Sequence, residues 1–277
     1  MPGKLLQDIN PGELEPLITN ALYSHSIDYQ DQINFVNEQR EQGQNCSVAG
    51  VLLLIQYQPD KGYVFLLNKR SDKVQQPGDL CCPGGSSNRI IDSLLGHLIT
   101  KPLLAWRKNP AYLKAKQLGP QPLNQITFFL TNALRESWEE IRLNPFAVNF
   151  LGPLSCYRLT LFKNIIFPIV GAVKAPLSLK PNWEVAKILQ IPLHSFFQEE
   201  NYGVYRLKVG NPIFKDIIQA DTIYYPCLIY QEPAQSTEIL WGATYSIIMS
   251  FLDTVFGFHP PELAGLPVIE SVLYPLS

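Results

Sequence analysis

Residues 135–140 read Arg-Glu-Ser-Trp-Glu-Glu, and this stretch carries most of the information about fold and function in the chain. On a helix, its three glutamates fall within an arc of about 100°, while three large apolar residues share the opposite face. The glutamates are Glu136, Glu139 and Glu140, and the apolar residues are Leu134, Trp138 and Ile141. Such a carboxylate cluster repels itself unless a cation lies among it, and Mg²⁺ prefers oxygen ligands. The pattern therefore predicts a buried helix with a metal-binding face.

An acidic helix face is also typical of plain solvated surface. Four further segments favour the metal site over that alternative. Residues 66–71 read Leu-Leu-Asn-Lys-Arg-Ser, and residues 78–85 end in Cys-Pro-Gly-Gly, a turn that allows close approach of the backbone to a ligand. Residues 182–185 read Asn-Trp-Glu-Val, and residues 241–244 read Trp-Gly-Ala-Thr.

Together these segments resemble the Nudix hydrolase superfamily and, within it, the coenzyme A diphosphatase branch. That branch has Leu-Leu-Thr-x-Arg-Ser, Phe-Pro-Gly-Gly, Arg-Glu-x-x-Glu-Glu, Asn-x-Glu-Val and Trp-Gly-x-Thr, and the five segments occur here in the same order over about residues 48–256. The resemblance implies an α/β (α+β) fold: a Nudix-type α/β/α sandwich with a mixed β-sheet, here with an inserted helical segment.

The chain departs from the Nudix box in three places. Gly85 and Arg135 are 50 positions apart where the family has 14, so 36 residues are inserted within the box. Ile91 stands where the box has a glutamate, and the adjacent Asp92 is the available substitute. Arg142 stands where a glycine usually follows the helix, so we expect Leu143-Asn144-Pro145 to end it. The segment before Pro-Gly-Gly also lacks the second arginine of the branch.

The resemblance also implies roles for individual residues. Metal would be held by the side chains of Glu136, Glu139 and Glu140 and by the carbonyl of Gly84, with Mg²⁺ as the ion or Mn²⁺ in its place. Arg135 would orient the glutamates through charge-assisted hydrogen bonds. The family takes its general base from the helix or from a distant loop, and Glu184 is the candidate outside the helix. A structural carboxylate is the alternative for Glu184.

Substrate would be bound near the glycine turn. Arg70 could bind a phosphate, although an exposed strand arginine without a role is the alternative, and the bare backbone at Gly85 allows a phosphate to approach. The implied reaction splits the diphosphate of coenzyme A, or of an acyl derivative, into adenosine 3′,5′-bisphosphate and a phosphopantetheine product. NADH and ADP-ribose are alternative substrates. A Nudix-fold binding or regulatory protein with weak catalysis is the alternative from another class.

Composition sets wider limits. The 277 residues are 46% hydrophobic, which is enough for a sizeable core, and the net charge is −2. The 22 lysines and arginines form no basic block, so we expect a small-molecule partner rather than nucleic acid or a membrane. Five cysteines without a C-x-x-C pair favour a reducing, cytoplasmic setting, and the four scattered histidines lack zinc spacing.

The expected organisation has three parts: an N-terminal helical extension over 1–45, a Nudix domain over 46–260 with an insertion at about 90–125, and a C-terminal tail over 261–277. Two short helices are expected within 12–42, and a hairpin joins strands 48–57 and 63–68. The acidic helix is expected from Asn124 or Thr127 to about Leu143. Further strands are expected at 150–154, 158–162, 165–173, 188–192, 202–209 and 224–230, and a closing helix at 241–256.

The insertion is expected to form helices at one edge of the site, because it contains aromatic and aliphatic residues that can be buried. As a lid, it could bring basic side chains to the substrate phosphates. A structural flap or a homodimer contact with solvated charges is the alternative. The basic residues are Lys101, Arg107, Lys108, Lys114 and Lys116.

Overall fold

The computed structural model of the chain describes residues 11–88, 91–93, 95, 108–159, 164–174, 177–209, 220–232 and 236–273. Its α-helices are α2 (Pro11–Leu22), α3 (Tyr29–Glu41), α6 (Pro110–Gln117), α7 (Pro120–Ile141) and α9 (Gly242–Phe256). The two helices expected within 12–42 and the closing helix are confirmed as α2, α3 and α9.

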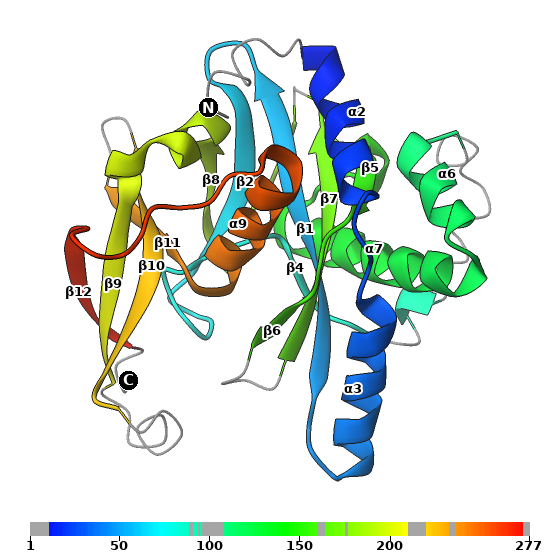
Figure 1. Cartoon of the computed structure of the whole chain (residues 1–277), viewed down its shortest axis with the longest axis horizontal. Helices are drawn as coiled ribbons and strands as arrows, with labels where there is room; N and C mark the ends of the chain where they lie inside the picture. The colour runs from blue at the N-terminus through cyan, green and yellow to red at the C-terminus, as the bar shows by residue number, and fades with distance from the viewer. Residues whose placement is uncertain are drawn as a thin grey trace.

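The larger sheet has eight strands and is mixed (Figure 1). Its central strand β1 (Ser47–Gln58) pairs in parallel with β7 (Asn164–Val173) and antiparallel with β2 (Gly62–Arg70), which confirms the expected hairpin. The other strands pair antiparallel with these three. They are β3 (Leu80–Cys81) and β8 (Val185–Pro192) on β2, β4 (Gly84–Ser86) on β1, and β5 (Val148–Pro153) and β6 (Tyr157–Leu159) on β7.

Side chains along β1 alternate between two separate cores, as the period of two along a strand requires. Val51, Leu53 and Ile55 pack with residues of α2 and α9. Leu52 and Leu54 pack on the other face with residues of α3, α6 and α7. The sheet thus lies between two helical layers (Figure 1), which confirms the expected α/β/α arrangement with a mixed sheet.

A second sheet of four strands lies beside the first and completes the fold. Its order is β11 (Thr237–Trp241), β10 (Thr222–Gln231), β9 (Tyr202–Val209) and β12 (Val268–Leu273). β12 pairs in parallel with β9. The segment expected as a C-terminal tail therefore contributes a strand to this sheet.

The acidic helix is longer than the sequence indicated. It begins at Pro120 rather than at Asn124 or Thr127, because Pro120 takes the first helical position, where a missing N–H costs nothing. It ends at Ile141, where Arg142 itself adopts the left-handed conformation with φ 57°. The expected use of Asn144 as the exit residue was wrong, since its side chain instead caps the short 3-10 helix Pro145–Ala147.

Other boundaries also differ from expectation. Trp138 was expected on the buried face of α7, but it is 45% exposed and its ring packs under the Arg142 guanidinium, 5.5 Å away. The strand expected over 158–162 is described as Tyr157–Leu159, and residues 160–163 lie outside the described ranges. Within the insertion, residues 91–93 are helical and α6 follows.

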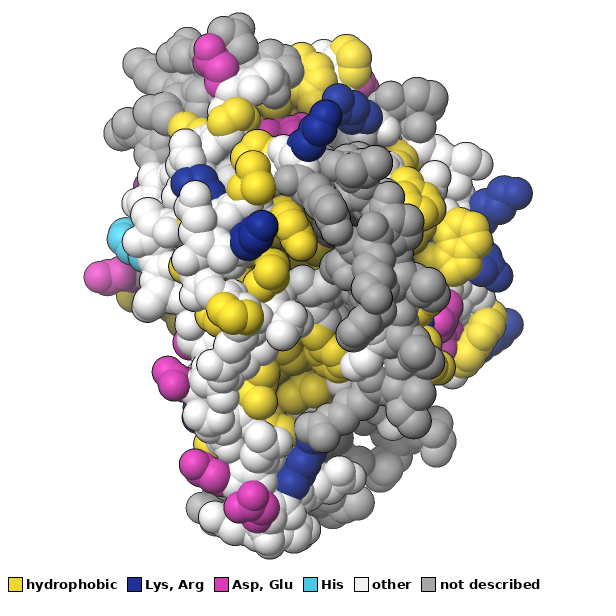
Figure 2. Space-filling model, turned by 90° about the vertical axis from the view of Figure 1, so that its right-hand side faces the viewer, with side chains coloured by type: hydrophobic (Ala, Val, Ile, Leu, Met, Phe, Trp, Pro, Cys, Tyr) yellow, Lys and Arg dark blue, Asp and Glu magenta, His cyan; other side chains and the backbone are white. Residues whose placement is uncertain are grey.

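The cysteines at positions 46, 81, 82, 156 and 227 are free thiols. Over the described ranges, none of the helices combines the length and the apolar character needed to cross a bilayer. On the face at the α6 end of the molecule, basic and acidic side chains are scattered among hydrophobic ones (Figure 2).

Candidate functional site

The acidic helix is fixed against the start of β1 by a close backbone contact. A side chain at Gly50 would come within 2.5 Å of the Asn132 Oδ1 atom and 2.7 Å of the Phe129 carbonyl, so only glycine fits there. The Gly50 N–H donates to Asn132 Oδ1 at 2.6 Å, and Asn132 Nδ2 donates to the Ser86 carbonyl at 3.2 Å. Asn132 thereby ties α7 to both β1 and β4.

The glycine turn lies where β4 joins the same edge of β1. Gly84 pairs with Val51 and has a φ of 146°, a conformation that favours glycine. A side chain there would come within 2.4 Å of the Gly50 carbonyl. The turn is therefore held at one position on the sheet, directly facing α7.

Arg135 is the centre of an ion-pair cluster. Its Nε donates to Asp92 Oδ1 at 2.7 Å, and its two terminal nitrogens lie 2.8 Å from Glu136 Oε1 and 3.1 Å from Glu139 Oε1. It also donates to the Ser86 carbonyl at 3.3 Å. A planar guanidinium can hold several acceptors in fixed directions, and Arg135 makes the contacts with both glutamates that the role implied by the resemblance requires.

Asp92 is fully buried, and both of its carboxylate oxygens have partners. One accepts from Arg135 and the other accepts from the Asn88 N–H at 2.7 Å. Asp92, the residue after Ile91, therefore contacts Arg135 of α7 and holds its guanidinium in place.

Glu140 lies against the glycine turn. Its Oε2 atom accepts from the Gly84 N–H at 3.2 Å and from Asn68 Nδ2 at 3.0 Å. Burial raises the pKa of Glu140 to about 8, and the nearby charges of Glu136 and Glu184 add to the effect, while the Gly84 amide and Arg70 oppose it. Without a cation, this carboxyl therefore tends to hold a proton near neutral pH.

Glu136 lies one helical turn before Glu140 and beside Gly85. A side chain at Gly85 would come within 2.8 Å of the Glu136 carboxyl carbon, so the glycine leaves room for that carboxylate. Burial raises the pKa of Glu136, with contributions from Glu139 and Asp92, and Arg135 acts in the opposite direction. Glu139 differs, because 53% of its side chain is exposed.

Glu184 comes close to the helix glutamates although it is 44 positions away from Glu140 in sequence. The Asn182 N–H donates to the Glu140 carbonyl at 2.7 Å, and the Glu184 carbonyl accepts from the Ser71 N–H at 2.8 Å. These two backbone bonds place the segment between α7 and the end of β2. The Glu184 charge is near enough to raise the pKa of Glu140.

A cleft of about 600 Å³ opens beside the glycine turn. Gly84, Gly85 and Arg70 line it, whereas the glutamates of α7 do not; Glu140 and Glu136 contact the turn itself. The Arg70 Nε donates at 2.7 Å to the carbonyl of Gln75, which also lines the cleft. This volume is in the usual range for sites that bind small molecules.

Trp241 forms part of the far wall of the cleft. Its indole N–H donates to Asp79 Oδ1 at 3.1 Å, and its ring centroid lies 5.3 Å from those of Tyr205 and Tyr225. The closing helix was expected to begin at Trp241, but Trp241 precedes α9 and lines the cleft, whereas Tyr245 of α9 is buried.

The carboxylates meet several conditions for a divalent cation. Glu136 and Glu140 are partly buried, repel each other and have raised pKa values. A bound cation would stabilise their charged forms. Within the described ranges, however, no three His, Cys, Asp or Glu side chains are gathered tightly enough to hold a metal ion. Glu139 points to Arg135, and the contact seen for Gly84 is made by its N–H. The donor set fits a cation in chemistry, with Glu136 and Glu140 as its core.

The described basic residues of the insertion do not line the cleft. Lys114 lies on α6 and lines a different pocket. Lys108 and Lys116 are exposed, and neither lines the cleft. Lys101 and Arg107 lie outside the described residues.

The sequence analysis did not predict two contacts of the site, those of Asn68 and Asn132. Asn68 occupies the position where the similar branch has threonine, and its contact with Glu140 depends on the pairing of β2 with neighbouring strands. Asn132 sits on the buried side of α7 among apolar residues. A buried asparagine on such a face is the one signal that could have pointed to it, because buried amides need partners.

Among solved structures, several Nudix proteins are similar to this chain at low sequence identity. No protein-family model and no curated protein matches the sequence. The Nudix hydrolase RenU from M. smegmatis is similar at 15% identity over 53% of this chain and 70% of that one, with a TM-score of 0.35. A MutT/nudix family protein from Enterococcus faecalis is similar at 12% identity over 84% and 74%, with a TM-score of 0.40. The NUDIX domain of NrtR from Shewanella oneidensis, solved with ADP ribose, is similar at 13% identity over 57% and 80%, with a TM-score of 0.33.

Proposed function

We propose that this chain is a Nudix-type hydrolase that uses a divalent metal ion to cleave the diphosphate linkage of a nucleotide substrate. One observation supports this most directly: Glu136 and Glu140 lie against the glycine turn, and the same turn lines a cleft of about 600 Å³. Partly buried carboxylates can hold a cation, and an adjacent glycine backbone leaves room for a phosphate beside that cation.

The metal would be held by Glu136 and Glu140, joined by Glu139 and by the Gly84 carbonyl. We propose Mg²⁺, with Mn²⁺ as the substitute. When bound, such an ion neutralises phosphate charge and makes a coordinated water more acidic. Arg135 keeps Glu136 and Glu139 in place, and buried Asp92 keeps Arg135 in place.

The remaining steps fall to residues at the edges of the site. Glu184 is proposed as the general base that takes a proton from the attacking water, since its charge already acts on Glu140. Arg70 lines the cleft and is proposed to bind a phosphate of the substrate. The backbone at Gly85 offers a surface without a side chain on which a phosphate can rest.

Coenzyme A, or an acyl derivative, is the substrate that we propose first. The support is the resemblance of residues 66–71 and 241–244 to the coenzyme A branch, together with the position of Arg70 and Trp241 on the same cleft. The products would be adenosine 3′,5′-bisphosphate and a phosphopantetheine compound. NADH and ADP-ribose remain alternative substrates with the same chemistry. Whichever of the three is the substrate, we propose that the protein acts on it in the cytoplasm.

The deciding experiment incubates the purified chain with coenzyme A, NADH and ADP-ribose, each with Mg²⁺, Mn²⁺ or EDTA, and identifies products by mass spectrometry. We expect metal-dependent cleavage of coenzyme A that Glu139→Gln or Glu140→Gln lowers by orders of magnitude. Glu38→Gln is the matched control, because Glu38 is an exposed helix glutamate on α3. Unchanged turnover in both site variants would remove the assigned metal site.

A Nudix-fold binding or regulatory protein is the second candidate. Two observations favour it: the absence of a ready group of three metal ligands among the described residues, and the ion pair that turns Glu139 toward Arg135. On this alternative the chain would bind one of the three nucleotides and would cleave none of them. Calorimetry of the same nucleotides in EDTA, combined with the product analysis in Mg²⁺, distinguishes the two candidates, because binding without cleavage favours the second.

A further inference from the structure

We propose that a second pocket, remote from the cleft, binds a flat-ringed organic anion that also carries hydrogen-bond donors, of which a nucleoside monophosphate is a simple example. We call it the α2 pocket and define it by Glu15, Thr19, Tyr57, Tyr63, Lys114 and Lys174. Its volume is about 680 Å³, within the range of small-molecule sites. This inference does not depend on the proposed hydrolase activity.

The α2 pocket and the cleft lie at opposite ends of β1. Ala49 and Val51 line the cleft, whereas Ile55 and Tyr57 line the α2 pocket. The nearest of these residues, Val51 and Ile55, are four positions apart, which is roughly 13 Å along a strand. None of the glutamates of α7 lines the α2 pocket, so a ligand there would not touch them.

The floor of the pocket is apolar and its outer wall is aromatic. Leu151 of β5 and Ile55 of β1 form part of the floor, and both are almost completely buried. Tyr57 and Tyr63, next to the turn of the β1–β2 hairpin, contact each other edge to face with centroids 5.2 Å apart. Tyr57 is 41% exposed, so a ring face is available for stacking with a flat ligand.

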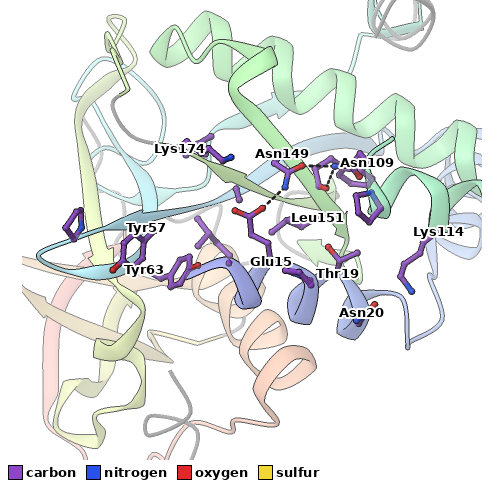
Figure 3. Close-up of a pocket in the computed structure, with 18 residues that line it drawn as sticks. Glu15, Thr19, Asn20, Tyr57, Tyr63, Asn109, Lys114, Asn149, Leu151 and Lys174 are labelled. Carbon is purple, nitrogen blue, oxygen red and sulfur yellow. Dashed lines mark hydrogen bonds between the residues drawn. The ribbon is translucent and has the colours of Figure 1, made fainter. Parts of the chain in front are cut away.

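A chain of polar side chains crosses the pocket from α2 to α6 (Figure 3). Asn149 Nδ2 donates to Glu15 Oε2 at 2.6 Å, and Asn109 Nδ2 donates to Asn149 Oδ1 at 2.7 Å. Asn109 is fixed in turn, because its side-chain oxygen caps α6 by accepting from the Tyr112 N–H at 2.9 Å. These bonds hold the Glu15 carboxylate within the pocket as an acceptor for ligand N–H or O–H groups.

Two lysines stand on opposite sides of the pocket (Figure 3). Lys114 comes from α6, and Lys174 follows β7. Among the described residues, neither side chain has an ion-pair or hydrogen-bond partner, although Glu15 is nearby. The Thr19 hydroxyl, from α2, also has none there. The pocket therefore offers two positive charges against one carboxylate, and that carboxylate is engaged by Asn149.

These groups together specify the ligand chemistry. The apolar floor and Tyr57 suit a flat ring, the Glu15 carboxylate suits hydroxyl or amino donors, and the two lysines suit an anionic group. A ligand without the anion would leave both lysines unpaired, and a bare anion would leave the floor and the aromatic wall unfilled. Only a molecule with all three features satisfies the whole pocket.

The test is isothermal titration calorimetry of the full chain with AMP in EDTA, in which metal-dependent cleavage is blocked. We expect saturable binding that the double variant Lys114→Glu/Lys174→Glu weakens at least about tenfold, since two favourable charge contacts become repulsive. Tyr57→Ala should weaken it as well. Lys116→Glu is the matched control, because Lys116 lies on the same helix and outside the pocket. Adenosine and inorganic phosphate should each bind at least about tenfold more weakly than AMP.

The outcomes separate the α2 pocket from the cleft. Absence of AMP binding, or equal affinity in the wild type and the double lysine variant, would overturn the proposal. So would binding that is lost in Arg70→Ala and kept in the double variant, since that places AMP in the cleft. A circular dichroism spectrum of each variant checks that the fold is retained, and the half-buried to exposed positions of both lysines make this the expected result.

Discussion

Replacing Glu140 with glutamine should stabilise the protein when no metal is present. The Glu140 carboxylate is half-buried next to other acidic groups, and burial raises its pKa to about 8. Glutamine has the same shape and keeps an oxygen that can accept from the Gly84 N–H and from Asn68, so both hydrogen bonds can persist. The substitution removes the charge while it preserves the contacts.

The size of the effect follows from the difference in pKa between the folded and unfolded chain. The folded value of about 8 lies above the ordinary value of 4.5, so the stability from the bound proton is complete below pH 4.5 and is lost as the pH rises toward 8. At about 1.4 kcal/mol per pH unit, the wild type loses up to about 3 kcal/mol of unfolding free energy by pH 7. For a chain of this size that corresponds to roughly 6 °C in Tm.

Thermal unfolding in EDTA between pH 4.5 and pH 8.5 measures the effect. We expect Glu140→Gln to melt above the wild type at pH 7 and the gap to close toward pH 4.5, whereas added Mg²⁺ should raise the Tm of the wild type only. Glu139→Gln is the matched control, because its side chain is 53% exposed. If Glu140→Gln melts no higher than the wild type at pH 7, or if the gap is independent of pH, the account of Glu140 as an uncompensated buried carboxylate is refuted.

Three other substitutions probe the surrounding contacts. Gly85→Ala would bring a methyl group within 2.8 Å of the Glu136 carboxyl carbon, and steady-state assays should show turnover reduced at least about tenfold; full activity would contradict the close fit. Arg135→Lys removes the Nε–H that Asp92 accepts, and urea unfolding should show a loss of about 2 kcal/mol, with no loss as the contrary result. Burial opposes ionisation of Glu238, but its ion pairs with Lys69 and Lys187 lower its pKa. The stabilising effect of its charge is therefore present at neutral pH and is lost as the pH falls. Glu238→Gln should make the free energy of unfolding less dependent on pH in the acid range, and an unchanged dependence would exclude this role.

Local patterns predicted much of the fold and of the site. The hairpin between β1 and β2, the helices α2, α3 and α9, and the acidic face of α7 all follow from apolar periodicity and turn residues close together in sequence. The ion pair of Arg135 with Glu139 is the ordinary pairing of residues four positions apart on a helix, whereas the ion pair with the adjacent Glu136 is not specified by helix periodicity.

Helix limits were harder to predict, because several residues can begin or end a helix. Pro120 begins α7 four positions before the nearer expected cap, and Arg142 ends it in a conformation that glycine normally takes. Trp138 has the apolar character of a core residue and still lies at the surface, where it contacts the side chain of Arg142. Residue preferences in the sequence only rank the possible helix ends and buried positions, and the packing of the folded chain selects among them.

The sequence by itself determined which chemical groups are present and on which face of a local element they lie: three glutamates on one side of a helix, and a bare glycine turn elsewhere. Only the tertiary structure decided which distant groups meet them. The amide of Gly84, the side chains of Asn68 and Asp92, and the charge of Glu184 reach α7 through strand pairing and burial, which no local pattern specifies. The physical reason is that helix and strand periodicity fixes direction within one element, whereas the distance between elements is set by how their apolar faces pack.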